Sequence, residues 1–210
     1  MARDFRSLTS FQLDALQEIG NIGAGNAATA LSKLIGKRVE MGIPRIDICH
    51  FSDVPDIVGG PETHVAGVYI KISGSAPGMI LLLFPVEDAK QLLSILLKDY
   101  NEKTSTSNTF NQFESSALME VGNILTGSFL NALATLTSLK YIPSVPAFCA
   151  DMAGAILGTV LHNAGMVGDK VLYFKTDLHL QAFRCIKGHL FFLPEAESLE
   201  AILNMLGVNN

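Results

Sequence analysis

Residues 13–34 read LDALQEIGNIGAGNAATALSKL, a helical pattern with more glycines than a helix normally carries. The centre of this stretch returns at residues 118–136 as LMEVGNILTGSFLNALATL. At an offset of 102 residues, half of the fourteen positions from Glu18 to Leu31 are identical, where unrelated segments would share about one. The sequence therefore indicates an internal duplication.

Five polar or backbone-shaping residues keep the same spacing in both copies. An acidic or hydroxyl residue, a glutamate, an asparagine, a glycine and a distal proline recur in that order. Duplication alone preserves some residues for the fold, but the recurrence of the whole set favours a function for it. The residues are Asp14, Glu18, Asn21, Gly25 and Pro44 in the first copy, and Ser116, Glu120, Asn123, Gly127 and Pro146 in the second.

Each copy predicts the same order of elements: a helix, a strand interrupted by proline, a hairpin of two strands and a closing helix. We expect a break or bend in the first helix near its glycines. Seven extra residues of the second copy fall within 151–169. The chain therefore divides into repeat 1 at about 9–100, a polar linker at about 101–111 and repeat 2 at about 112–206. The expected elements are 11–35, 38–51, 64–73, 77–84 and a helix after Pro85, then 113–139, 141–150, 171–180, 183–193 and 195–206.

The strands of one copy have apolar faces that a single copy cannot bury. The 210-residue chain is 49% hydrophobic, which is enough for one shared core. We therefore expect an α+β fold over residues 1–210. We expect this fold to be a single pseudo-twofold domain with a mostly antiparallel six-stranded sheet flanked by helices.

Charge and hydropathy exclude two classes of protein. The net charge is −5, and no basic cluster exceeds Lys37-Arg38, whereas nucleic acid is bound through a basic footprint. The longest apolar run, 79–84, is far shorter than a membrane span, and the N-terminus lacks the apolar core of a signal peptide. We expect a cytoplasmic protein that binds another protein or a small ligand.

Neither the cysteines nor the histidines form a catalytic or metal-binding motif. The three cysteines are odd in number and show no CxxC spacing, which is typical of reduced packing residues. The five histidines are scattered without an HExxH motif, so surface or structural roles are the stronger interpretation. We expect no metal site and no bound cofactor.

The first helix divides its residues between two faces. At about 100° per residue, Asp14, Glu18, Asn21 and Gly25 fall within a narrow outward stripe. Glycine on this stripe lets another molecule approach the helix closely, whereas Gly20 and Gly23 on the inward face serve close packing. An ordinary solvated face explains a lone glutamate, and helix capping explains a lone asparagine, but their recurrence at the same spacing in both copies weakens these explanations without excluding them.

A dinucleotide site is the obvious alternative for the glycines, because GAGNAA at residues 23–28 fits a G-x-G-x-x-A string. That fingerprint requires a strand directly before it, and LDALQEI before it has a helical pattern. No GK[ST] motif follows any glycine loop, and no G-x-S-x-G motif is present. The nucleotide interpretation is therefore weak.

The arrangement [DS]-x3-E-x2-N-x22-P, present twice, resembles the signature of the CheC/CheX/FliY family of bacterial chemotaxis phosphatases. The resemblance covers essentially the whole chain, and the two-copy layout is most similar to the CheC members. It implies hydrolysis of the aspartyl phosphate on the response regulator CheY. The working pairs would then be Glu18 with Asn21, and Glu120 with Asn123.

The chemistry of phosphoryl transfer is compatible with that implication. Its loose transition state demands alignment of the attacking water more than its deprotonation, so an amide suffices. An exposed carboxylate is a weak base at neutral pH, so the glutamates are better interpreted as docking anions toward a lysine of the regulator. The Mg²⁺ is expected on the regulator. Asp14, Ser116, Pro44 and Pro146 would support the motif without catalysing.

Two other functions stay open. The same fold is similar to the central domain of the flagellar switch protein FliM, which suggests a binding module without turnover. The family resemblance also implies association with the receptor deamidase CheD, so that sequestration of a partner replaces hydrolysis. Retention of both Glu/Asn pairs favours the phosphatase.

Overall fold

The computed structural model describes residues 8–42, 45–98, 108–164, 170–180 and 185–208. Pro44 and most of the expected linker lie outside the described residues. In the described ranges, no helix is both long and apolar enough to cross a membrane.

One sheet holds all the strands that the structure describes, and every pairing is antiparallel. Its main path runs β1-β7-β8-β4-β3-β5, with β2 also beside β7 and β6 also beside β3. All six predicted strands are present. Each of the two proline-interrupted strands is divided into two segments, so the described sheet has eight strands. The strands are β1 (Val39–Met41), β2 (Ile46–His50), β3 (His64–Gly74), β4 (Gly78–Pro85), β5 (Tyr141–Pro143), β6 (Ala147–Met152), β7 (Lys170–Leu180) and β8 (Ile186–Pro194).

The two halves exchange strands across the sheet. Strands β1 and β2 of the first half pair with β7 of the second, and β5 and β6 of the second pair with β3 of the first. The hairpins meet at the centre, where β4 pairs with β8. Neither half therefore completes its sheet alone, which confirms the prediction of a single pseudo-symmetric fold.

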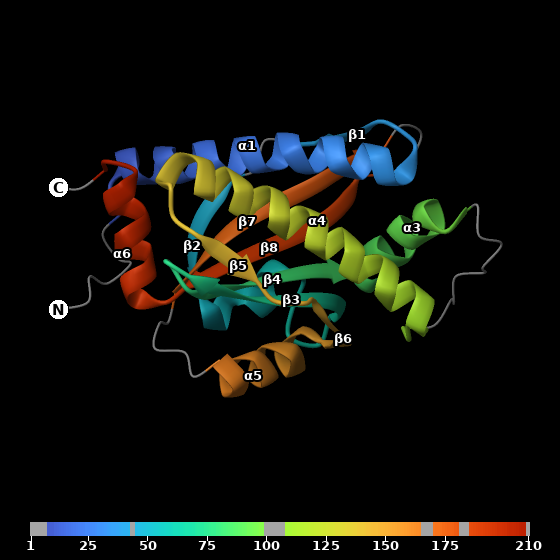
Figure 1. Ribbon diagram of the computed structural model, residues 1–210. Coiled ribbons are helices and arrows are strands. Elements are labelled where there is room, and N and C mark those ends of the chain that lie inside the picture. Colours follow the sequence, from blue (N-terminus) through green and yellow to red (C-terminus); the bar gives the residue numbers. More distant parts are fainter. Residues whose placement is uncertain (1–7, 43–44, 99–107, 165–169, 181–184, 209–210) are drawn as a thin grey trace.

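Helices cover both faces of the sheet (Figure 1). The long helices α1 (Ser10–Ile35) and α4 (Gln112–Thr137) lie side by side on one face, with α3 (Val86–Leu96) and α6 (Ala196–Met205) at opposite ends of the pair. The short α2 (Val54–Ile57) and α5 (Ala153–Ala164) pack on the other face. Helix α5 lies within 151–169, where the seven extra residues were predicted. Strand β7 starts 106 residues after β3 and β8 starts 108 residues after β4, so some of these residues lie in the second hairpin instead.

Both long helices begin with the same capping arrangement. The Thr9 hydroxyl accepts a hydrogen bond from the Gln12 backbone N–H at 3.2 Å, and the Gln12 side chain accepts one from the Thr9 N–H at 2.9 Å. Asn111 and Glu114, at the equivalent positions, repeat this exchange at 2.8 and 2.9 Å. The duplication therefore extends to the cap, which fixes where each helix starts.

The expected break in the first helix is wrong, because α1 is continuous from Ser10–Ile35 and close packing accommodates its glycines. A Cβ built at Gly23 would lie 3.2 Å from the Cα of Phe129 on α4. On α4, a Cβ at Gly122 would lie 2.5 Å from Cγ1 of Val68 on β3. The inward glycines let the helices seat against each other and the sheet, as predicted for that face.

Two glycines of α4 provide a matched test of this packing. Gly122→Ala should lower the free energy of unfolding by about 1–3 kcal/mol, because the new methyl overlaps Val68. Gly127→Ala meets no atom within 4 Å and should raise it by roughly 0.5–1 kcal/mol through helix propensity. Urea unfolding followed by circular dichroism measures both. Equal effects of the two changes would contradict the packing account.

Candidate functional site

The four first-copy residues that the structure describes lie on the side of α1 away from the sheet. Asp14, Glu18 and Gly25 are exposed, and Asn21 is half-buried. The opposite side of the helix is packed through its buried residues, which are Gln12, Leu16, Ile19, Gly20, Gly23, Ala27 and Leu31. The polar stripe therefore forms the outer crest of α1, as the helical periodicity predicts.

The second copy places its stripe in the same way on α4. Ser116, Glu120 and Asn123 are exposed, and Gly127 is half-buried. The Ser116 hydroxyl donates a hydrogen bond to the Gln112 carbonyl oxygen at 2.7 Å, within its own helix. Because α1 and α4 lie side by side on one face of the sheet, both crests belong to one surface of the molecule (Figure 1).

The prolines of the motif lie off the helices. Pro146 is half-buried and comes directly before β6. The neighbouring Ser144 is held against β3, because its N–H donates to the Lys71 carbonyl oxygen at 2.8 Å and its hydroxyl accepts from the Lys71 N–H at 3.1 Å. Pro146 thus belongs to a loop fixed to the sheet. Pro44 lies outside the described residues.

The two asparagines differ in their surroundings. The Asn21 side-chain oxygen accepts a hydrogen bond from Nε2 of Gln17 at 3.3 Å, and the Gln17 side-chain oxygen accepts one from the Ile46 N–H of β2, also at 3.3 Å. The position equivalent to Gln17 is Met119, which cannot form this bridge. Within the described part of the chain, the Asn123 side chain makes no hydrogen bond.

Gln17 is the residue that the sequence interpretation missed. Its signal was present as a Gln–Asn pair spaced four residues apart on one helix, an arrangement that brings the two side chains together. The link from Gln17 to β2 restrains Asn21 in one orientation. Asn123 has more freedom because Met119 offers it no such link.

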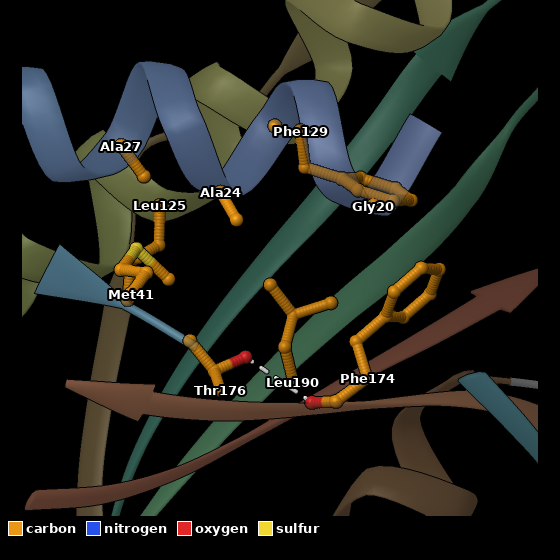
Figure 2. A pocket seen from close by; sticks show the side chains of 10 residues that line it. Gly20, Ala24, Ala27, Met41, Leu125, Phe129, Phe174, Thr176 and Leu190 are labelled. Carbon is orange, nitrogen blue, oxygen red and sulfur yellow. Dashed lines mark hydrogen bonds between the residues drawn. The ribbon is translucent and has the colours of Figure 1, made fainter. Parts of the chain in front are cut away.

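A small cavity of about 30 Å³ lies beneath the helix pair (Figure 2). Figure 2 shows Gly20, Ala24 and Ala27 of α1 above side chains of the sheet. Thr176 has the one polar side chain among the lining residues, and its hydroxyl donates a hydrogen bond to the Phe174 carbonyl oxygen at 3.1 Å. No carboxylate or carboxamide lines this cavity, so the chemistry of the motif belongs to the outer surface.

The three thiols and the buried imidazole of His189 are poorly suited to catalysis. All three cysteines are free, burial raises the pKa of Cys49 to about 11, and it also raises the pKa of Cys149 and Cys185, which keeps these thiols protonated and weakly nucleophilic. Burial lowers the pKa of His189 to about 4, and its Nδ1 lies 2.9 Å from the Tyr173 hydroxyl. No group of three or more His, Cys, Asp or Glu residues in the described ranges is placed to hold a metal ion.

Comparison with known proteins gives a family match on the two motif-bearing units. The model of the CheC-like family matches residues 11–47 and 113–149, which are separated by the same 102 residues as the repeat. The "CheY-P phosphatase CheC" of Bacillus subtilis (strain 168) is 33% identical over 208 residues, covering 98% of each chain.

Solved structures share the fold at low sequence identity. The crystal structure of Thermotoga maritima FliY matches with a TM-score of 0.74 at 16% identity, covering 95% of this chain and 98% of that one. The FliM middle domain from H. pylori matches with a TM-score of 0.68 at 12% identity, covering 94% and 99%. These two likenesses support the architecture, and the full-length sequence match, with its two motif-bearing units, shows that the chain belongs to the CheC-like family.

Proposed function

We propose that this protein is a phosphatase that hydrolyses the aspartyl phosphate of the response regulator CheY. The observation that carries the proposal is the presentation of a glutamate and an asparagine, one turn apart, on the outer crest of each long helix. The name of the Bacillus subtilis relative, "CheY-P phosphatase CheC", supports the same activity. An exposed crest lacks an enclosed pocket, so the pocket in which the reaction occurs belongs to the regulator.

Asn21 and Asn123 are assigned the task of holding the attacking water. The water attacks phosphorus in line, the bond to the aspartate oxygen breaks, and the products are the free carboxylate and inorganic phosphate, which keeps the oxygen and both protons of the water. A carboxamide both donates and accepts hydrogen bonds, so it can fix a water without acting as a base. Alignment of this kind is where the protein contributes most of its rate enhancement.

Glu18 and Glu120 are assigned to docking. Both are exposed, and within the described residues neither forms an ion pair with another side chain. A free carboxylate one turn before the asparagine can therefore pair with a cation of the regulator. The Mg²⁺ that neutralises the phosphoryl group is assigned to the regulator.

Two finer assignments rest on the family resemblance. The receptor deamidase CheD is proposed as a second protein partner, and the cytoplasm as the compartment in which the protein acts. Asp14, Ser116, Pro44 and Pro146 are assigned supporting roles beside the two pairs.

A binding module without turnover is the competing function. The likeness to the FliM middle domain favours it, because that similarity covers 94% of this chain. Such a module would bind the regulator without shortening the lifetime of its phosphate. Retention of both asparagines on exposed crests favours the phosphatase.

Removal of the two carboxamides separates these functions. Asn21→Ala and Asn123→Ala should each leave a partial activity, and the double variant should fall close to spontaneous phosphate loss, because no amide is left to align the water. Release of inorganic phosphate from phosphorylated CheY measures the rate, and circular dichroism checks the fold. Asn204→Ala, an exposed asparagine on α6, is the control and should keep full activity. An active double variant would refute the assignment.

The bridge from Gln17 predicts a difference between the two sites. In the Asn123→Ala background, Gln17→Met should lower kcat by roughly three- to tenfold, because Asn21 loses its restraint. KM should stay unchanged, since Glu18 still docks the regulator. The control is Met119→Leu in the Asn21→Ala background, which should leave kcat as it was. A change in KM alone would assign Gln17 to docking instead.

A further inference from the structure

The register of the two crests follows from one close contact. Helices α1 and α4 run in opposite directions (Figure 1), and Gly23 packs directly on the Phe129 backbone. Moving two residues along each helix from that contact brings Gly25 opposite Gly127. The two outward glycines therefore lie at the same level of the helix pair, each on the side of its helix that faces away from this contact.

These two glycines form a bare spot between the Glu/Asn pairs. A Cβ built at Gly25 or at Gly127 would meet no atom within 4 Å. The missing side chains cost helix propensity, and packing does not require their absence. An incoming surface can approach the backbone closely there.

The two pairs are close together along the helices. By the same register, Asn123 lies opposite position 29 of α1, eight residues from Asn21. At 1.5 Å per residue, the two asparagines are offset by roughly 12 Å along the helix axes, and packed helix axes themselves lie roughly 8–10 Å apart. The glutamates lie farther out, at roughly 21 Å from each other on the same scale.

A protein partner needs more room than this spacing allows. A standard protein interface covers roughly 800 Å² on each partner, a round patch about 32 Å across, and a small, transient one covers up to roughly 600 Å², about 28 Å across. A regulator that covers one pair therefore also covers the bare spot and reaches the other pair. Two regulators would need overlapping footprints on one helical layer.

We propose that the two Glu/Asn pairs share one docking surface, centred on Gly25 and Gly127, which one regulator occupies at a time in either of two orientations. The orientations are related by the pseudo-twofold axis. This inference rests on the proposed function. It predicts that the pairs compete for the regulator, whereas separate sites would work independently.

Binding stoichiometry tests the competition. The probe is CheY with Mg²⁺ and beryllofluoride, a stable mimic of its phosphoryl group, titrated into the protein by calorimetry. Glu18→Lys and Glu120→Lys each reverse the charge of one exposed docking anion and leave the other pair intact. Wild type and both single variants should bind one regulator each, and the double variant should bind none.

The other outcomes have distinct meanings. Two regulators on wild type and one on each single variant would overturn the shared surface while leaving the proposed function intact. A single variant that binds none would also overturn it, because one pair would then not dock the regulator. Binding by the double variant, or none by wild type, would overturn the proposed docking itself.

Steady-state kinetics give a second measure with phosphorylated CheY. For competing pairs, kcat of wild type lies between the kcat values of Glu18→Lys and Glu120→Lys, and each variant raises KM, by about twofold if the pairs are equal. For independent sites, kcat of wild type equals the sum of the two. These two relations between the kcat values hold even if the pairs differ in activity.

The bare spot allows a test across the two copies. With Glu18→Lys present, only the second pair docks, yet Gly25→Phe on α1 should weaken its affinity by at least about tenfold, because a ring would fill the shared contact. The matched control is Ser10→Phe, which adds similar bulk at an exposed position of the same helix but farther from Asn123, and should change affinity less than about twofold. Equal effects of the two phenylalanines, or none from Gly25→Phe, would overturn the shared surface.

Discussion

The close seating of α1 against α4 and the sheet is the constraint on which the rest of the structure depends. It requires positions without side chains, because a methyl at Gly122 would overlap Val68 and a methyl at Gly23 would crowd the Phe129 backbone. Ring contacts from Phe129 to Phe174 and Phe192, at 4.9 and 5.5 Å between centroids, then fix the height of α4 above the sheet. A helix pair held this firmly presents its outer crest as a rigid surface.

Glycine serves two different purposes in these helices. The inward glycines are compensated by packing, since burial of neighbouring apolar side chains contributes about 25 cal/mol per Å². The outward Gly25 and Gly127 have no such compensation within the chain, because a Cβ at either position would meet no atom within 4 Å. Their cost, roughly 0.5–1 kcal/mol each, is expected at a surface that another molecule must approach. The face of the helix on which a glycine lies therefore decides whether it serves packing or the approach of another molecule.

Much of the fold follows from the sequence because its signals are local and repeated. The repeat indicated where the helices start, where the strands lie and which stripe faces outward, and the cap residues Thr9 and Asn111 keep the offset of 102 residues. The continuity of α1 was not predictable from propensity, since tertiary packing at Gly23 offsets the glycine cost. The bridge from Gln17 to Ile46 and the contact of Gly23 with Phe129 were also hidden, because each joins segments whose distance depends on the tertiary fold.

Strand exchange explains why both motifs face the same way. Had each half formed its own sheet, the two crests would be free to point in unrelated directions. Instead β7 pairs with β1 and β2 of the other half, β3 pairs with β5 and β6, and β4 pairs with β8. The long helix of each half must therefore pack on the same face of one sheet. Duplication of a helix–strand unit therefore leads to two copies of one motif on a single surface. The spacing of the pairs is set by helix packing, which makes their competition for one partner a consequence of the fold.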